Sequence, residues 1–249
     1  ENRPLALQTA SVQSGKTQPV RIDAPQDCGR FISRVIENVD AGAVTPEWLK
    51  QRLQRSGIRS ISALVDIGNY VMLELGQPMH VFDADKLHGS IIVRRAENGE
   101  TLACLNEKTV TLADNTLVIA DEQGALSMAG LMGGEESAVS DGTRNIVLEA
   151  AWFAPAIIAG KSRQYGFGSD SAFRFERGVD WTLQADAIER ATELVLQICG
   201  GEAGALTEAL GQLPVANRVE VRLSRVETLL GVHIEAAQVE AILRHLGLS

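Results

Sequence analysis

The sequence contains few cysteines and few aromatic residues. Its three cysteines, Cys28, Cys104 and Cys199, are odd in number and lie far apart in the chain. This spacing argues against a disulfide framework or a zinc knuckle and is typical of a protein from a reducing compartment. We therefore expect a cytoplasmic location and no metal site.

Excess basic charge, long apolar runs and familiar catalytic motifs are also missing. The formal net charge is −9, which argues against a broad non-specific nucleic-acid surface but leaves room for a local basic patch. No apolar stretch approaches the length of a membrane span and no signal-peptide pattern occurs, so we expect a soluble protein. No HExxH, GxSxG, P-loop or CxxC pattern is present. An enzyme of this sequence would therefore work by positioning groups rather than by a metal or a strong nucleophile.

The sequence does have enough apolar residues for a sizeable core. Its 249 residues, 45% of them hydrophobic, allow one large domain or two. Apolar periodicity predicts an α+β fold, with helices flanking a sheet of short, mainly antiparallel strands. Helices are predicted over 46–57, 60–75, 155–165 and 181–199, and strands over 31–36, 91–93, 101–102, 109–112, 116–119 and 146–148.

Local signals refine two of these helices. Thr45, followed by Pro46 and Glu47, is predicted to cap the first helix, because threonine accepts well at a helix N-cap and proline suits the first turn. Asp66, in the second helix, is predicted to be a surface acid. Asn69 lies further along the same helix among apolar neighbours.

The two ends of the chain differ from its centre. Residues 1–24 are polar and are interpreted as a linker with room for one short strand, so the main domain is placed at 25–205. Residues 206–249 are interpreted as a connector followed by the truncated start of another domain. In detail, the pattern predicts a connector over 204–215, a strand over 219–223 and helices over 224–230 and 235–246. The chain begins at Glu1 rather than at methionine, and we expect it to be part of a longer protein.

Paired glycines and a nearby carboxylate form the most informative stretch. Gly133 and Gly134 follow an apolar run, and glycine lets a backbone or a ligand approach closely. Glu149 follows a short strand and is flanked by apolar residues. The stretch is either an ordinary hairpin ending in a solvated glutamate or a site with a carboxylate buried for a purpose.

Three further residues are candidates whose ordinary explanations remain open. His80 follows a Gly-Gln-Pro turn, and a single histidine is more often packed or exposed than catalytic. Asn69 is equally a satisfied helix amide, and Arg59 a solvated charge between two helices. The charged segment RFERGVD (174–180) suggests a salt network about as readily as a binding site.

Three long blocks resemble one family. They are LVDIGNYVMLELGQPMHVFDADKL (64–87), AGLMGGEESAV (129–139) leading to NIVLEAAWF (145–153), and SDSAFRFERGVD (169–180). In this order they resemble the central, editing region of bacterial phenylalanine–tRNA ligase beta subunits. The resemblance covers about 31–201, and 219–249 resembles the start of the next, winged-helix-like domain of those subunits.

The resemblance implies an aminoacyl-tRNA deacylase that hydrolyses Tyr-tRNA(Phe). A synthetic site shaped for phenylalanine cannot strongly reject tyrosine, so a second site must remove the error. Glu149 would accept the hydrogen bond of the tyrosine phenol, and Gly133 and Gly134 would form a wall cleared for its ring. His80, Asn69 and Arg59 match positions that hold the amino acid or the terminal adenosine.

The same resemblance implies the partners. They are the alpha subunit in a heterotetramer of two alpha and two beta subunits, tRNA(Phe), and a tyrosine moiety as editing substrate, with no membrane. ATP and Mg²⁺ would serve the synthetic site of the whole enzyme, with no cofactor in this part. Bond breaking would be attack of a positioned water on the aminoacyl ester.

Two departures from the family pattern leave an alternative open. Gly68 stands where the family commonly has threonine. Ser169 and Ser171 would line the substrate pocket, where Ser171 replaces a small apolar lining residue with a hydroxyl. The alternative is a non-catalytic module that packs on the alpha subunit and helps to seat tRNA.

Overall fold

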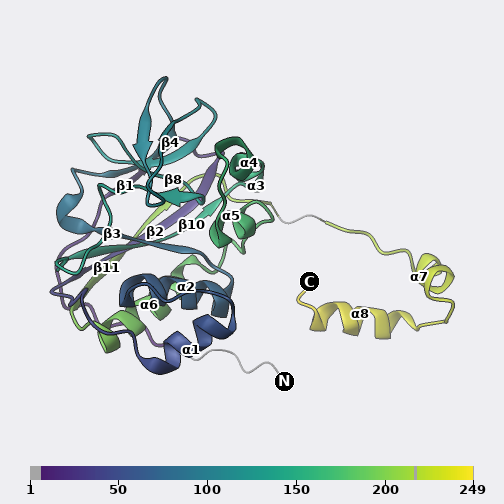
Figure 1. The fold of residues 1–249 in the computed structure, drawn as a ribbon. Helices are drawn as coiled ribbons and strands as arrows, with labels where there is room; N and C mark the ends of the chain where they lie inside the picture. Colours follow the sequence, from purple (N-terminus) through teal and green to yellow (C-terminus); the bar gives the residue numbers. More distant parts are fainter. Residues whose placement is uncertain (1–6, 216–217, 249) are drawn as a thin grey trace. The chain divides into compact units, whose positions relative to one another are not determined.

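A computed structural model describes residues 7–215 and 218–248. By internal contacts the chain divides into two compact units, Glu1–Pro214 and Val215–Ser249. Residues 1–6 of the predicted linker, and residues 216–217 and 249 of the predicted C-terminal part, lie outside the described residues. The first unit carries all of the sheets (Figure 1).

A four-stranded antiparallel sheet forms the centre of the first unit. Its strand order is β11-β2-β10-β3, so β10 lies between two neighbours. All eight side chains of β10 are buried, because both of its edges are paired and both of its faces are covered. The strands are β2 (Cys28–Glu37), β3 (Met79–Asp83), β10 (Ile146–Phe153) and β11 (Glu202–Leu210).

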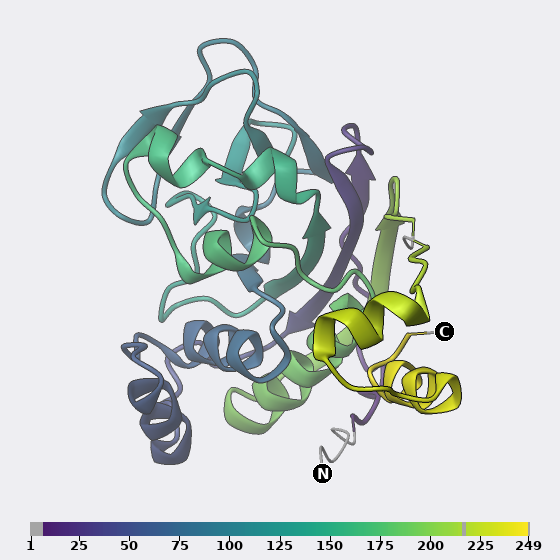
Figure 2. The same cartoon turned by 90° about the vertical axis from the view of Figure 1, so that its right-hand side faces the viewer.

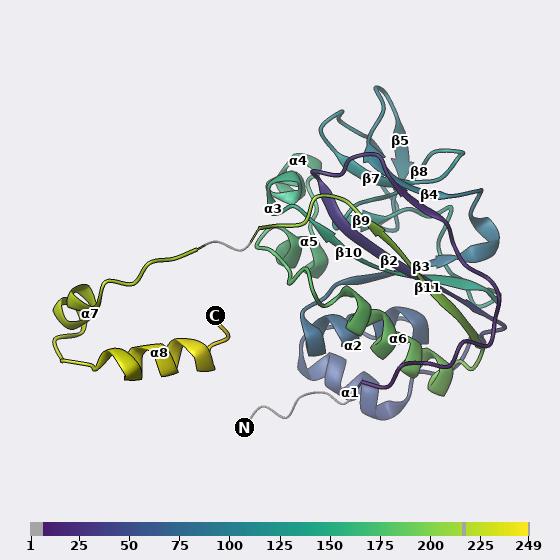
Figure 3. The same cartoon turned by 180° about the vertical axis from the view of Figure 1, so that it is seen from behind.

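A second sheet and a small ribbon complete the strands. The five-stranded sheet has the order β1-β4-β7-β8-β9; its β1–β4 pair is parallel and the others are antiparallel. It comprises β1 (Val20–Ile22), β4 (Ile91–Arg95), β7 (Leu117–Ala120), β8 (Ala125–Met128) and β9 (Met132–Gly133), and the ribbon comprises β5 (Thr101–Ala103) and β6 (Thr109–Thr111). The view from behind shows β7, β8 and β9 together (Figure 3).

Helices cover one face of the four-stranded sheet and the second sheet covers the other. Two helices, α2 (Ala63–Leu75) and α6 (Gln184–Ile198), pack on the first face, and α1 (Glu47–Arg55) packs against α2. In Figure 2 the blue α1 and α2 and the light green α6 lie below the long strands. Strand alternation separates the two cores: Leu148 and Ala150 face the helices, whereas Val147 and Ala151 face the five-stranded sheet.

Short helices fill the remaining connections. They are η1 (Ala84–Lys86), α3 (Pro155–Ile158), α4 (Lys161–Tyr165) and α5 (Asp170–Phe175) in the first unit, and α7 (Leu223–Leu230) and α8 (Ala236–His245) in the second. The α+β prediction with mainly antiparallel short strands is confirmed, as is the short strand in the predicted linker. The helix predicted over 155–165 is interrupted at Gly160, which has φ +79° and separates α3 from α4.

Two predictions near the C-terminal end are wrong. Most of the expected connector over 204–215 is strand β11, which pairs with β2 along its length as far as Leu210. Its sequence, EAGALTEAL, has few β-branched residues, so backbone pairing at a sheet edge decides the conformation rather than propensity. The strand expected over 219–223 is absent from the described residues, and α7 starts at Leu223.

Two further predictions, for Asp66 and Thr45, are wrong because of contacts at the start of α2. Asp66 is fully buried rather than on the surface. Its carboxylate accepts hydrogen bonds from the Thr45 hydroxyl at 2.7 Å, the Ser60 hydroxyl at 2.5 Å and the Ile61 N–H at 2.9 Å. Thr45 therefore ties two helices together instead of capping α1, whose N-cap position is Pro46.

Candidate functional site

Two ionisable side chains, His80 and Glu149, lie side by side on the neighbouring strands β3 and β10 of the four-stranded sheet. Glu149 of β10 is the register partner of His80 on β3, and opposite residues of an antiparallel pair project from the same face. That face is turned toward the five-stranded sheet, because Val147 and Ala151, two positions to either side of Glu149, belong to the core between the sheets.

Glu149 is a buried acid with an unsatisfied oxygen. Its side chain belongs to a residue that is 5% exposed, and its Oε2 atom has no hydrogen-bond partner among the described residues. Burial raises the pKa of Glu149 to about 8, because a carboxylate is poorly solvated away from water. At neutral pH the group is therefore mainly an uncharged acid. The interpretation of Glu149 as a solvated residue is wrong.

His80 is a neutral imidazole held between aromatic and backbone neighbours. Its Nε2 atom is buried without a partner in the described chain, and burial lowers the pKa of His80 to about 4. The ring meets Phe82 edge-on, with centroids 4.5 Å apart. A Cβ at Gly133 would lie 2.7 Å from His80 Cε1. Glycine at 133 therefore allows the imidazole to keep its place.

A cavity of about 190 Å³ opens beside this pair. An apolar cavity of about 150 Å³ holds one benzene molecule, so this space suits one aromatic ring with a small substituent. Most of the residues that line it are apolar, and three serine hydroxyls join His80 and Glu149 as its polar groups. The lining residues are Pro78, Met79, His80, Ile119, Ser127, Met128, Gly130, Leu131, Met132, Gly133, Glu149, Phe153, Ser169, Ser171 and Phe175.

The two predicted serines lie at this cavity in different ways. Ser169 is the N-cap of α5: its hydroxyl donates to the Leu131 carbonyl at 2.8 Å and accepts from the Ala172 N–H at 3.1 Å. Ser171 makes only a long contact of 3.9 Å with the Met72 sulfur. Ser171 is therefore the hydroxyl of the two that is available to a ligand.

Several residues that line the cavity were not predicted from the sequence. Ser127 lies on β8 opposite Gly133 on β9, while Phe153 and Phe175 come from β10 and α5. Phe153 carried a usable signal, because it lies four positions after Glu149 in one strand and so shares its face. Ser127 and Phe175 had none, since only the tertiary fold brings them here.

Gly134 does not line this cavity. It pairs with β8, donating its N–H to the Leu126 carbonyl at 2.8 Å, and a Cβ there would lie 2.4 Å from that same oxygen. Successive residues of an extended segment point to opposite sides. The predicted pair of wall glycines is therefore divided: Gly133 faces the cavity and Gly134 permits a close backbone approach.

Gly134→Ala is expected to destabilise the protein by about 1–3 kcal/mol, because the added methyl group meets rigid backbone rather than a mobile side chain. Urea unfolding would measure the loss. Gly42→Ala is the matched control, since a Cβ there meets nothing closer than 3.6 Å. Equal stability of the two variants would contradict the close approach.

A second cavity of about 500 Å³ adjoins the first, and the two share Met79 and His80 as walls. Asn69 and Gly68 line the second cavity, and the Asn69 amide makes no hydrogen bond to the described residues. His80 and Asn69 are thus brought together, with His80 at the boundary. Arg59 is exposed between α1 and α2 and lines neither cavity.

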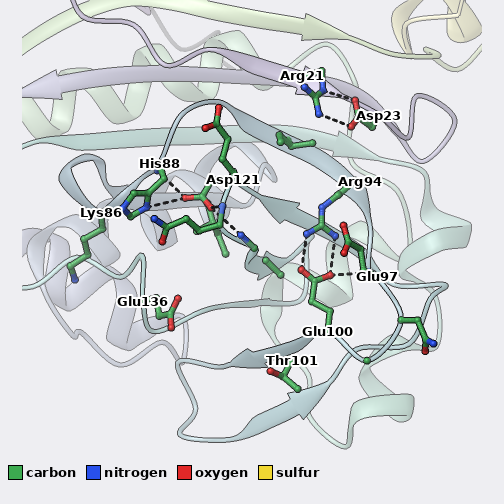
Figure 4. Close-up of a pocket in the computed structure, with 18 of the residues that line it drawn as sticks. Arg21, Asp23, Lys86, His88, Arg94, Glu97, Glu100, Thr101, Asp121 and Glu136 are labelled. Carbon is green, nitrogen blue, oxygen red and sulfur yellow. Dashed lines mark hydrogen bonds and ion pairs between the residues drawn. The ribbon is translucent and has the colours of Figure 1, made fainter.

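A larger cavity, about 1210 Å³, lies elsewhere and is strongly charged (Figure 4). Both of its arginines are paired with carboxylates. Arg94 holds Glu100 through two bonds of 2.7 and 2.9 Å, and Arg21 holds Asp23 at 2.7 Å. Because these groups already satisfy each other, the cavity beside Glu149 is the better candidate site.

Two features are absent from residues 7–215 and 218–248, the part of the chain that the structure describes. Histidine, cysteine and carboxylate side chains form no group of three with metal-binding geometry in that part of the chain. Within the same residues, no helix is long and apolar enough to cross a bilayer.

The fold and this cavity define a domain of two facing sheets with an acid and an imidazole beside a ring-sized space. Residues 27–200 match the family model described as the B3/4 domain. The chain belongs to the B3/4 domain family.

The chain is also similar to known proteins over nearly its whole length. Over 245 residues the chain is 79% identical to the phenylalanine–tRNA ligase beta subunit of Neisseria gonorrhoeae, covering 98% of this chain and 31% of that protein. It is 53% identical over 249 residues to the same subunit of Chromobacterium violaceum, covering 100% of this chain and 32% of that protein. The resemblance to these beta subunits is therefore confirmed, and the chain spans about a third of their length.

A solved structure shows a weaker likeness. An N-terminal fragment of the phenylalanyl-tRNA synthetase beta subunit from Pyrococcus horikoshii has 14% sequence identity and a TM-score of 0.49, over 96% of this chain and 67% of that one. At this level the likeness assigns no residue a role.

Proposed function

We propose that this chain is the editing part of a phenylalanine–tRNA ligase beta subunit and hydrolyses tyrosine wrongly attached to tRNA(Phe). The observation that carries the proposal is Glu149, whose buried carboxyl has no hydrogen-bond partner among the described residues and lines a cavity the size of one aromatic ring. The beta subunits that it matches so closely support the assignment to this ligase. In this proposal the complete enzyme also contains the alpha subunit, binds tRNA(Phe), and uses ATP and Mg²⁺ outside this chain.

The need for a second site follows from the chemistry of the two amino acids. Tyrosine differs from phenylalanine by one hydroxyl, and a pocket built for the smaller ring rejects an added hydroxyl only weakly. A site that requires the hydroxyl discriminates better, because the wrong ligand leaves a buried polar group unpaired. Glu149 supplies that group: with tyrosine bound its carboxyl pairs with the phenol, and with phenylalanine it does not.

Hydrolysis would proceed by attack of water on the aminoacyl ester. The water oxygen forms a bond to the ester carbonyl carbon, and the bond from that carbon to the ribose oxygen breaks. The proton ends on the ribose oxygen, which gives free tyrosine and an uncharged tRNA end. Asn69 and His80 border the larger cavity that adjoins the ring-sized one, so they are suited to orient the ester and the water. Because the imidazole is neutral at pH 7, its role is hydrogen bonding rather than cationic stabilisation.

Deacylation by the complete ligase tests the proposal. Wild-type enzyme is expected to hydrolyse Tyr-tRNA(Phe) and to spare Phe-tRNA(Phe), measured as the loss of labelled amino acid above the enzyme-free rate. A failure to hydrolyse Tyr-tRNA(Phe), with normal aminoacylation, would contradict it. That outcome would instead favour the non-catalytic module, which Gly68 and Ser171 leave open.

Discrimination is expected to increase with pH. Glu149 is mainly neutral below its pKa of about 8 and ionised above it, and hydrogen bonds to an ionised acceptor are roughly twice as strong as neutral ones. The ratio of tyrosine to phenylalanine deacylation should therefore rise about tenfold between pH 6.5 and pH 9. His80, with a pKa of about 4, stays neutral throughout this range.

Glu149→Gln is the control for this pH dependence. It keeps the size of the side chain and cannot ionise, so its ratio should be flat over the same range. A flat or falling ratio in the wild type would show that ionisation of Glu149 has no part in discrimination.

A further inference from the structure

Ser33 on β2 belongs to a row of three polar side chains on the neighbouring strands β2, β10 and β3. It is the register partner of Glu149, which in turn is the register partner of His80. The neighbours of Ser33 at two positions to either side, Phe31 and Val35, lie in the core between the two sheets. All three polar residues therefore project from the same face, turned toward the five-stranded sheet.

Each residue of this row has a buried polar atom without a partner. The atoms are Ser33 Oγ, Glu149 Oε2 and His80 Nε2, and they are half of the six such side-chain atoms among the described residues. Buried unpaired groups are costly, so native proteins keep few of them. Three such atoms in adjacent register positions indicate a site whose hydrogen bonds are completed when a ligand binds.

The two oxygens of Glu149 have different surroundings. Oε2 is buried, whereas Oε1 is not among the buried unpartnered atoms and accepts no hydrogen bond from the described residues. Glu149 itself lines the ring-sized cavity. The geometry thus leaves Oε1 for a ligand in the cavity and Oε2 for a group within the sheet.

Ser33 is the hydroxyl placed to serve Oε2. It is fully buried and is not a wall of the cavity, so it does not touch a ligand there. Cβ atoms of directly opposite residues in an antiparallel pair are about 4.5–5.5 Å apart. At this separation, rotation about the Cα–Cβ bond of Ser33 can bring its hydroxyl to the Glu149 carboxylate. On the other side of Glu149, His80 already contacts Gly133 and Phe82.

We infer that Ser33 is a positioning residue for discrimination: its hydroxyl donates to Glu149 Oε2 when a ligand engages Oε1, and so fixes the carboxyl against the ligand hydroxyl. This inference rests on the proposed editing function. It predicts that loss of the Ser33 hydroxyl weakens discrimination without touching the reacting ester. The titratable groups that face Glu149 are His80 on β3 and Cys28 on β2, whose thiol pKa is raised mainly by burial and in part by Glu149.

The test is deacylation by the complete ligase carrying Ser33→Ala, with Ser137→Ala as the matched control. Ser137 is also buried and also has an unpartnered hydroxyl, but it lies outside the row and lines neither cavity beside His80. Ser33→Ala should lower the tyrosine-to-phenylalanine ratio about 3- to 10-fold and move the pH midpoint of that ratio upward, because the ionised carboxyl loses a donor. Ser137→Ala should change neither, and aminoacylation should stay normal in both variants.

Two additional variants keep the result interpretable. Ser33→Thr retains the hydroxyl and should keep the wild-type ratio. In a Glu149→Ala background, Ser33→Ala should have no further effect on the ratio, since coupled residues are not additive. An unchanged ratio in Ser33→Ala, or an equal loss in the Glu149→Ala background, would overturn the role of Ser33 while leaving editing intact. A wild-type enzyme that does not deacylate Tyr-tRNA(Phe) would overturn both.

Discussion

Replacing Gly133 by tryptophan is expected to lower the deacylation of Tyr-tRNA(Phe) by the complete ligase at least about hundredfold. The indole would project into a cavity of about 190 Å³ and fill the space that a tyrosine ring needs. Aminoacylation with phenylalanine should be unaffected, because in our proposal that reaction takes place in another part of the enzyme. The comparison of these two rates in one preparation separates a blocked cavity from a misfolded protein.

Two variants sharpen this experiment. Gly133→Ala fills little of the cavity, but its Cβ would lie 2.7 Å from His80 Cε1, so the imidazole must move. A partial loss of about tenfold is expected if the place of His80 matters. Gly15→Trp is the control, since nothing lies within 4 Å of a Cβ there. Wild-type deacylation by Gly133→Trp would show that the ester is hydrolysed elsewhere.

Replacing Glu149 by alanine is expected to reduce the preference for tyrosine about 5- to 150-fold, which corresponds to about 1–3 kcal/mol. The tyrosine hydroxyl would lose its partner, and phenylalanine would no longer leave a carboxyl unpaired. The loss should therefore appear in the ratio of the two deacylation rates more than in either rate alone. Measuring both substrates with Glu149→Ala and Glu149→Gln separates the loss of any acceptor from the loss of ionisation.

The Glu149 experiment has a clear contrary outcome. If Glu149→Ala still hydrolyses Tyr-tRNA(Phe) in strong preference to Phe-tRNA(Phe), the hydroxyl is recognised by another group. The three serines that line the cavity, Ser127, Ser169 and Ser171, would then be the candidates. Of these, Ser169 already has both a donor and an acceptor partner within the protein.

The sequence predicted regular elements well where a local signal decided them. Helix α2 has the expected period and ends at Gly76, which has φ +78°, a conformation that glycine adopts without strain. Strand β11 was missed because its conformation depends on pairing with β2, which lies far away in the sequence. Asp66 was misplaced for a similar reason, since its three hydrogen-bond donors belong to the segments before α2.

The candidate site, too, could be predicted from the sequence only where a local signal decided the structure. The residues alone left Glu149 either solvated or buried, because the run EAAWF has no alternation of polar and apolar positions. Its burial follows from the central place of β10 between two strands and two covered faces. The pairing of Glu149 with His80, and the different directions of Gly133 and Gly134, depend on strand register, which local sequence does not specify.

A crystal structure of the complete ligase with tyrosine bound at this site tests the central claim most directly. We expect the tyrosine ring in the cavity walled by Gly133 and Phe153, with its phenol oxygen about 2.5–3.0 Å from a Glu149 oxygen. The same crystals with phenylalanine should leave the cavity empty at the same concentration. A tyrosine ring that binds outside this cavity, or one whose phenol points away from Glu149, would contradict the account.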